Sequence, residues 1–181
     1  MSTRHVVLPR AFEMFPLFKA MAERELRVWF YAEPPQVKLF DKVLKELPEL
    51  VAIFNHCGFM VSLDNLSIDE HNRPHFSVDL PPETLDLLEM VAANPNTHVH
   101  FSGQYAFTHD PYPHNDMKPI AQRLFKIFGP SRMLWASDFP WITEEPGYKK
   151  QLALVDYLLP ELNTEDRSKI CGGNAEKLFI F

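Results

Sequence analysis

The amino-acid sequence predicts an α/β fold built on a parallel β-sheet, and three observations predict it. Short apolar runs that are typical of strands alternate along the chain with longer runs of helical periodicity. Three of the apolar runs end in polar side chains, as strands of parallel sheets do where their carboxyl ends form a binding rim. Sixteen prolines against six glycines indicate long, stiff connections between these elements.

The first half of the chain contains two predicted strands and two predicted helices. Residues 13–24 have helical periodicity, and residues 26–31 form an apolar strand that is closed by two prolines. Residues 36–47 form an amphipathic helix, because five apolar side chains fall on one face: Val37, Phe40, Val43, Leu44 and Leu47. The strand 50–54 follows. The next loop, 57–80, is longer than ordinary connections, so we expect it to be functional or an insertion over the rim of the sheet.

The third strand and its neighbours continue the alternation. Residues 82–93 form a predicted helix, and residues 97–101 form the strand. The loop 105–115 is rich in histidine, proline and aromatic residues. A helix over 117–128 ends at Gly129, which we expect to serve as its C-cap.

The last predicted strand is 133–135, and three helices close the chain: 148–159, 164–171 (capped by Asn163 or Thr164) and 174–179. We therefore expect four strands, each followed by a helix, in a single domain over residues 1–181. A closed TIM (β/α)8 barrel takes at least about 200 residues, so the chain holds roughly half of one. Half a barrel leaves two open sheet edges. The chain is then a fragment, one half of a closed homodimer, or the partner of a separate N-terminal half.

Composition and charge exclude several classes of partner. The formal net charge of −6, with no block of basic residues, argues against nucleic acid and against an anionic membrane surface. No apolar run approaches the roughly 20 residues of a membrane span. Cys57 and Cys171 lie far apart and outside any CxxC pattern, which indicates reduced thiols. We expect a cytoplasmic protein whose partner is a small-molecule substrate.

Two of the strand ends carry residues that are suited to acid–base or metal chemistry. His56 follows the second strand and Asp138 follows the fourth, so both should lie at the same rim. The pair could bind a divalent metal, or Asp138 could act as general base on a water molecule. The alternatives are a turn-forming or capping role for Asp138 and a loop-capping role for His56. Cys57 adjoins His56, but neighbouring strand residues point in opposite directions, which argues against a Cys-His nucleophile pair.

His98 and His100 lie two residues apart in the third strand, so their side chains project from the same face. If Thr97, Val99 and Phe101 face the helices, both histidines face the barrel interior. This geometry suits two metal ligands. A polar interior layer or an uncovered half-barrel face is the alternative, because the pair lies in mid-strand rather than at the rim.

Further polar residues follow the third strand and enter the loop behind it. We expect His100, Ser102, Gln104 and His109 to contact a substrate, since rim loops carry specificity. For His109 the alternative is an ordinary surface histidine. Neither glycine pattern that cradles phosphate, GxGxxG or GxxxxGK[ST], occurs in the chain.

Four segments of the sequence together carry a resemblance to a known protein family. Residues 128–141 read FGPSRMLWASDFPW, 52–58 read AIFNHCG, and 96–103 read NTHVHFSG, while 167–179 include the turn Gly-Asn-Ala. These resemble, in order, the last barrel strand, the Asp-His-x-Gly strand, the Lys-x-Ser-Gly strand and the C-terminal helices of the amidohydrolase-related family. That family includes 2-pyrone-4,6-dicarboxylate lactonases, sugar lactonases and aminocarboxymuconate-semialdehyde decarboxylase. The chain is thus similar to the C-terminal half of that family's TIM barrel.

The resemblance implies roles for the two strand-end residues. Asp138 would be the general base or the metal-binding carboxylate of the last strand. His56 would bind metal or polarise the substrate carbonyl. The implied reaction is hydrolysis of a lactone, ester or amide by an activated water, or a related decarboxylation, with a Zn or Mn ion as an optional cofactor.

The sequence also departs from the family pattern. The family opens with a strand bearing His-x-His, and no such strand precedes residue 26. Asn55 stands where the family usually has Asp, and His100 where it usually has Lys. With only His56 and Asp138 to carry the chemistry, we expect a hydrolase that is incomplete in this chain. The alternative is a catalytically inactive half-barrel that acts as a subunit or a binding protein.

Overall fold

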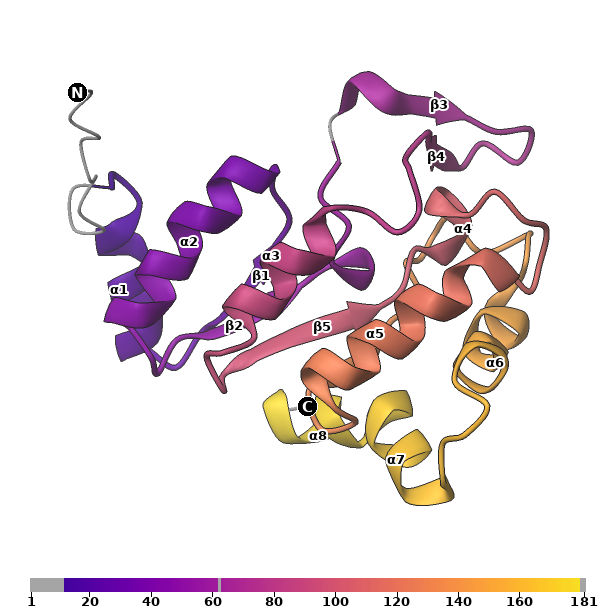
Figure 1. Ribbon diagram of the computed structural model, residues 1–181. Helices are drawn as coiled ribbons and strands as arrows, with labels where there is room; N and C mark the ends of the chain where they lie inside the picture. The colour runs from indigo at the N-terminus through magenta and orange to yellow at the C-terminus, as the bar shows by residue number, and fades with distance from the viewer. Residues whose placement is uncertain (1–11, 62, 180–181) are drawn as a thin grey trace.

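A four-stranded parallel sheet forms the centre of the fold in the computed structural model, which describes residues 12–61 and 63–179 (Figure 1). Its strands pair in the order β1 (Arg27–Phe30), β2 (Val51–Phe54), β5 (Thr97–Phe101) and β6 (Met133–Trp135). All three pairings are parallel. The four strands predicted for this sheet are therefore confirmed.

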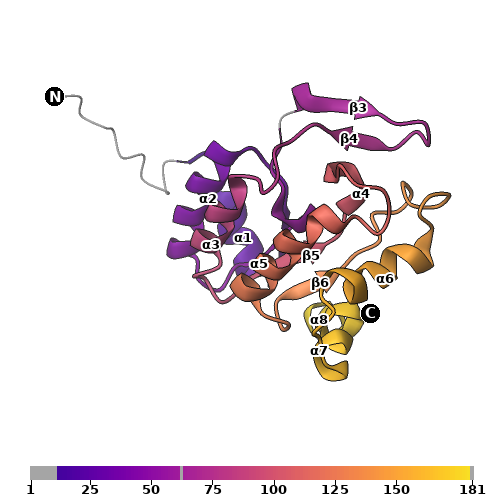
Figure 2. The same ribbon diagram turned by 45° about the vertical axis from the view of Figure 1, so that its right-hand side comes forward.

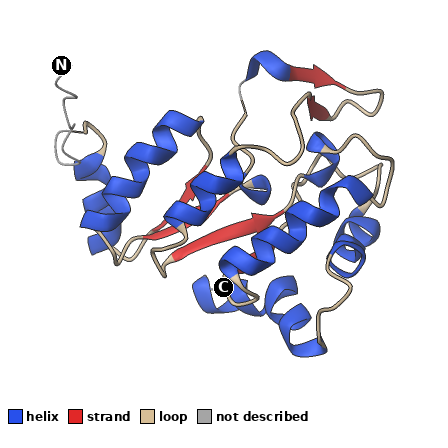
Figure 3. Ribbon diagram, viewed as in Figure 1, coloured by secondary structure: helices blue, strands red, loops and turns tan. Residues whose placement is uncertain are grey.

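Helices cover one face of the sheet (Figure 3). In this layer α2 contacts α3, α3 contacts α5, and α5 contacts α6, while α1 packs beside β1. The bounds are α1 (Phe15–Glu23), α2 (Pro34–Glu46), α3 (Thr84–Val91), α5 (Lys118–Phe128) and α6 (Tyr148–Leu158). The short helices α7 (Thr164–Ser168) and α8 (Asn174–Leu178) follow, and Asn163 caps α7 by accepting a hydrogen bond from the Asp166 amide. No helix within the described residues has the length and apolar character needed to span a membrane.

The long loop expected over 57–80, as a functional segment or an insertion over the rim, contains regular structure. It contains an antiparallel hairpin of β3 (Leu66–Ile68) and β4 (Pro74–Phe76), which stands above α4 in both views (Figures 1 and 2). Two single 3-10 turns, His56–Gly58 and Leu63–Asn65, precede it. Each hairpin strand has three residues and β3 is exposed throughout. The sequence therefore contains no alternation of apolar and polar residues from which these strands could be predicted.

Two helical segments also differ from the prediction. The loop expected over 105–115 begins with the one-turn helix α4 (Gln104–Phe107) and ends with a 3-10 turn (Asn115–Met117). The helix expected over 164–171 ends at Ser168, and a π-helical turn (Lys169–Gly173) leads into α8. Both segments are too short for a helical period to be recognised.

Side-chain alternation along the strands decides which residues face the helices. Phe30 of β1 stacks on Phe40 of α2 with ring centroids 4.2 Å apart. Val99 and Phe101 of β5 are buried in the same apolar core. His98 and His100 therefore project from the opposite face, as the sequence predicted.

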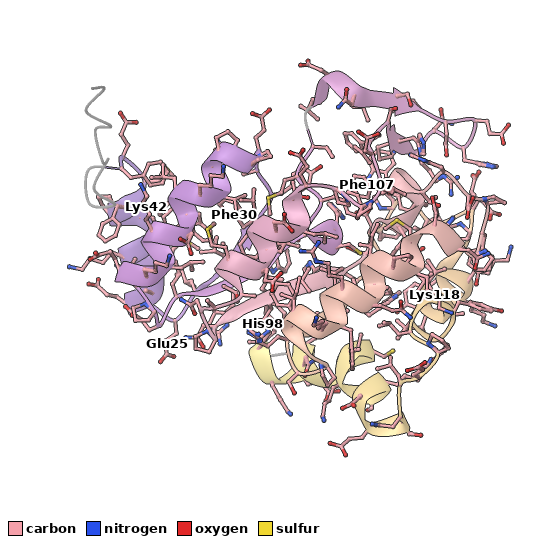
Figure 4. All side chains as sticks on the ribbon, viewed as in Figure 1. Glu25, Phe30, Lys42, His98, Phe107 and Lys118 are labelled. Carbon is pink, nitrogen blue, oxygen red and sulfur yellow. The ribbon has the colours of Figure 1, made fainter. Side chains whose placement is uncertain are left out.

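This opposite face is polar and partly open. His98 lies near the amino end of β5 (Figure 4) and is 9% exposed, and its Nδ1 has no hydrogen-bond partner among the described residues. His100 Nδ1 lies 2.9 Å from the Asn55 side-chain oxygen. The ring of Trp29, which is 63% exposed, contacts the rings of His100 and Phe179. The face is therefore a layer of polar and aromatic groups rather than a dry core.

Arg132, just before β6, connects the carboxyl ends of two helices. Its guanidinium donates to the carbonyls of Ile127 and Phe128 at the end of α5, and to those of Ala92 and Asn94 after α3. Carbonyls at a helix end lack partners within the helix and carry partial negative charge. The arginine of the FGPSR segment is therefore structural: it fixes the layer of helices against the start of β6.

We predict that Arg132→Met lowers the free energy of unfolding by about 2–4 kcal/mol, because four carbonyls lose a charged donor while the side-chain volume is kept. Urea unfolding followed by circular dichroism measures the change. Arg123→Met is the matched control, since the Arg123 side chain of α5 pairs with Asp86 and Glu89 of α3 at the exposed surface. A loss no larger than that of the control would contradict the structural role.

The two inward histidines predict how stability depends on pH. Burial lowers the pKa of His98 to about 4, and burial also lowers that of His100 to about 4. Between pH 6.5 and 4 the unfolded chain therefore binds more protons than the folded one, so stability falls as the pH falls. We expect each histidine to contribute between about 1 and 3 kcal/mol to this loss. Urea unfolding across this range should give a shallower pH dependence for the double variant His98→Gln, His100→Gln, and an unchanged slope would contradict the assignment.

Candidate functional site

The carboxyl ends of the four central strands meet around one small cavity. Tyr31 follows β1, His56 follows β2, Gly103 follows β5 and Asp138 follows β6. The cavity has a volume of about 160 Å³, and its remaining walls are apolar: Pro74, Phe76, Ala106, Phe107 and Trp141. Parallel pairing thus brings together side chains that lie far apart in the sequence.

Asp138 is held at the cavity by a hydrogen bond from a tyrosine. The Tyr105 hydroxyl donates to Asp138 Oδ2 at 2.7 Å. The backbone of Asp138 is left-handed, with φ of 60°, which is uncommon for a residue with a side chain. The carboxylate is 18% exposed, so it contacts both protein and solvent. The Asp138 side chain is therefore oriented by Tyr105, while its backbone carbonyl accepts from the Trp141 amide in a turn.

His56 lies beside Asp138, with 3.8 Å between His56 Nδ1 and Asp138 Oδ2. The same nitrogen is 3.3 Å from the Ser102 hydroxyl oxygen, and the ring packs edge-on against Tyr31. Burial lowers the pKa of His56, and the nearby Asp138 carboxylate opposes that shift. The imidazole is therefore neutral at neutral pH and can either donate or accept a hydrogen bond.

Close packing requires a glycine next to His56. Gly103 has φ of 74°, and a Cβ atom at this position would lie 2.9 Å from His56 Nδ1. Any larger residue would displace the imidazole and strain the backbone. Ser102 and Gly103 therefore both position His56: the serine hydroxyl contacts its Nδ1, and the glycine leaves room for the ring.

The other residues predicted to contact substrate lie at different distances from this cavity. Ser102 is buried and bonds to His56, while His100 bonds to Asn55 on the inner face of the sheet. His109 is exposed and lines two other surface hollows, not the cavity around Asp138. The chain turns away at Thr108, where the Asp116 carboxylate accepts bonds from the Thr108 hydroxyl and the His109 amide.

Gln104 differs most from its predicted position, because its side chain points into the protein. It is 1% exposed, donates to the Cys57 sulfur and accepts from the Gln151 amide at 2.7 Å. Burial raises the pKa of Cys57 to about 12, so this thiol stays protonated. The physical reason is local: the turn of α4 that begins at Gln104 directs this residue inward and Tyr105 toward Asp138.

Several residues of the site were not anticipated from the sequence. Tyr105 is the first, and the only feature of the sequence that could have indicated it is its position three residues after Ser102 at the rim. Tyr31 directly follows a strand and could have been found by the rule that identified His56. Phe76 comes from the hairpin and Trp141 from the loop after β6, and both positions depend on loop conformations that no sequence period encodes.

The described residues do not by themselves fit a metal centre. No group of three or more His, Cys, Asp or Glu side chains within 12–61 and 63–179 is arranged to hold a metal ion. His56 and Asp138 supply two donors, whereas catalytic zinc sites commonly use three protein ligands and a water. The chemistry that these residues can perform alone is proton transfer: an oriented carboxylate beside a neutral imidazole can accept a proton from water.

Comparison with known proteins places this arrangement in a family. Residues 2–181 match the family model described as Amidohydrolase. No curated protein sequence matches the chain.

Several solved structures share the fold at low sequence identity. An amidohydrolase from Burkholderia multivorans with bound zinc has a TM-score of 0.70 at 16% identity, over 95% of this chain and 58% of its own. A putative 2-pyrone-4,6-dicarboxylic acid hydrolase from Pseudomonas putida has a TM-score of 0.63 at 19% identity, over 90% of this chain and 55% of its own. A dihydroxybenzoic acid decarboxylase from Polaromonas sp. JS666, with bound manganese and an inhibitor, has a TM-score of 0.52 at 13% identity, over 92% of this chain and 53% of its own.

The chain spans little more than half the length of each of these proteins. A further structure with the same fold, from Bordetella bronchiseptica, is described as a TIM-barrel protein. The four-stranded parallel sheet with its outer helices is therefore part of a TIM barrel, as the sequence predicted. Since the family model covers nearly the whole sequence, the chain belongs to the amidohydrolase family.

Proposed function

We propose that the rim around Asp138 is one half of a hydrolytic site that opens a lactone or a similar ester or amide with an activated water. One observation carries this proposal: the Asp138 carboxylate is oriented by Tyr105 and adjoins a neutral His56 at a cavity with apolar walls. A general base needs an ionised carboxylate, a fixed orientation and room for a water and a carbonyl beside it. The family match and the rim position support the same assignment.

The proposed reaction uses the side chains of this rim in sequence. Asp138 accepts a proton from water, and the water oxygen attacks the carbonyl carbon of the ester. In the tautomer whose Nδ1 accepts from the Ser102 hydroxyl, the His56 Nε2–H donates to the carbonyl oxygen as negative charge develops there. The carbon–oxygen bond of the ester then breaks. Asp138 returns its proton to the leaving oxygen, so that one carboxylic acid and one hydroxyl group are formed.

The walls of this half of the site favour a planar, weakly charged substrate group. The volume of about 160 Å³ in this half is below the roughly 300–1,000 Å³ of complete ligand pockets, as expected for part of a site. Aromatic rings of Tyr31, Phe76, Phe107 and Trp141 form much of its wall, and no Lys or Arg side chain among the described residues lines it. A ring such as an unsaturated lactone fits these walls better than a polyhydroxylated sugar does.

A divalent metal would require donors beyond those described. Zinc and manganese occur in two of the similar structures. When bound, such a metal polarises a carbonyl and lowers the pKa of a bound water. His56 and Asp138 would be two of its ligands, and the other ligands would have to come from the groups that complete the barrel.

A second copy of the chain is the partner that we propose for completing the barrel. The outer edges of β1 and β6 pair with no other strand among the described residues. A two-fold axis parallel to the strands would place β6 of one copy beside β1 of the other, giving eight parallel strands. It would also bring two copies of His56 and of Asp138 to one rim, which doubles the number of metal donors to four.

A catalytically inactive half-barrel is the second candidate function. The shortage of metal donors within the described residues favours it. In that case the chain acts as a subunit or a binding protein. Substitution of Asp138 separates this candidate from the hydrolase.

We predict that Asp138→Asn lowers kcat for a panel of small lactones and aryl esters by about 100-fold or more, because the general base is lost while the shape is kept. Circular dichroism should show an unchanged fold. Ser137→Ala is the control from the adjacent position. A wild-type chain that hydrolyses none of the panel, with or without added Zn²⁺ or Mn²⁺, would support the inactive half-barrel instead.

We predict a homodimer in light scattering after size-exclusion chromatography, at twice the chain mass of 21.0 kDa. Trp29→Lys should convert it to a monomer, because this exposed ring lies on the inner face of edge strand β1. Ile68→Lys is the matched control, with similar exposure on the hairpin. A wild-type monomer at all concentrations would exclude self-closure and would favour a separate N-terminal half.

A further inference from the structure

The β3–β4 hairpin holds the helix that carries Tyr105. The guanidinium of Arg73 lies over the Tyr105 ring, 5.2 Å from its centroid. His75 Nδ1 lies 3.4 Å from the Tyr105 backbone carbonyl. Phe76 stacks on Phe107, whose ring lies beneath the hairpin (Figure 4), with centroids 5.5 Å apart. Three contacts, one from Arg73 just before β4 and two from β4 itself, thus set the position of α4.

Arg73 itself is fixed from two sides. Its Nε and one terminal nitrogen each lie 2.8 Å from Asp69 Oδ2 within the hairpin. Another terminal nitrogen donates at 2.5 Å to the backbone carbonyl of Glu145, in the loop between β6 and α6. The side chain is 13% exposed, so these charge-assisted bonds are largely shielded from water. Arg73 therefore joins the hairpin to the loop that carries Asp138 and Trp141.

Tyr105 connects this anchored arginine to the site. One face of its ring lies beneath the guanidinium, and its hydroxyl donates to Asp138 at 2.7 Å. Burial, and then the Asp138 carboxylate, raise the pKa of Tyr105, so the hydroxyl keeps its proton and stays a donor. A shift of the ring would lengthen this hydrogen bond, because the hydroxyl lies at the end of the side chain farthest from the backbone.

We propose that Arg73 is a positioning residue for the Asp138 carboxylate, which acts by holding the Tyr105 ring in the orientation from which its hydroxyl reaches Asp138. The catalytic consequence rests on the proposed hydrolytic function, whereas the positioning itself does not. A planar guanidinium can stack on the ring and bond sideways to Asp69 and Glu145 at the same time, which a lysine ammonium cannot do. The same bonds hold Pro74 and Phe76 in the cavity wall.

Fluorine NMR of protein labelled with 3-fluorotyrosine tests the positioning directly. Tyr105→Phe assigns the Tyr105 signal among the five tyrosines. We expect Arg73→Met to shift and broaden that signal, and Arg73→Lys to restore it only in part. Arg123→Met, a surface arginine held by Asp86 and Glu89, should leave it unchanged. A Tyr105 signal that is identical in wild type and Arg73→Met would overturn the proposal, and Arg73→Gln serves if the Met variant does not fold.

Kinetics with p-nitrophenyl acetate separate the positioning role of Arg73 from the proposed hydrolytic function. If the wild type hydrolyses the ester, Arg73→Met should lower kcat about tenfold or more with little change in KM. The double variant with Tyr105→Phe should lose no more than Tyr105→Phe alone, because both changes act through one contact. Additive losses of kcat in the double variant would overturn the proposal that Arg73 acts through Tyr105. If the wild type hydrolyses neither this ester nor the panel of lactones and aryl esters, the proposed function fails, and the fluorine signal still decides the role of Arg73.

Discussion

The parallel pairing of four short strands is the constraint on which the site depends. Because each strand runs in the same direction, every carboxyl end lies at one edge of the sheet. Tyr31, His56, Gly103 and Asp138 meet there although long helical connections separate them. The helix layer makes this pairing possible, since its apolar side chains bury one face of every strand. Arg132 stabilises the layer where two helix ends meet the start of β6. The chemistry at the rim thus depends on packing at the opposite end of the strands.

The backbone at the rim carries local strain that this packing must offset. His56, Cys57 and Asp138 are left-handed, and each such residue costs about 1–3 kcal/mol unless its surroundings hold it. Cys57 is held by its buried contacts with the Ser102 carbonyl and Gln104. Asp138 is held through Tyr105. The left-handed backbone directs His56 and Asp138 toward the same cavity. Regular strand geometry would not do this, because successive strand residues point in opposite directions.

The strands and the residues that follow them could be predicted from sequence, because a short apolar run indicates a buried strand and the polar residue after it marks the carboxyl end. His56 and Asp138 follow from that rule alone, and so does the inward direction of His98 and His100. Tyr105, Phe76 and Arg73 could not be predicted in the same way. Their positions depend on a one-turn helix and on a hairpin with exposed three-residue strands, neither of which has a period long enough to detect. Gln104 shows the same limit: it follows a rim strand as Ser102 does, yet the turn of α4 directs it into the core.

The side chains on the inner face of the sheet determine which groups must pack against that face when the barrel closes. A closed TIM barrel fills its interior with layers of packed side chains, mostly branched and apolar. Here the inner face presents Trp29, His98 and His100, with Phe179 covering only part of it. His98 Nδ1 is buried without a partner among the described residues, and a buried polar atom of that kind costs about 1–3 kcal/mol. In the proposed two-fold arrangement, the layer that meets this face must supply a hydrogen-bonding group to His98 and an apolar surface to Trp29. A second copy would bring its own His98, His100 and Trp29 to the axis, and these side chains can supply both a hydrogen-bonding group and an apolar ring to the facing half.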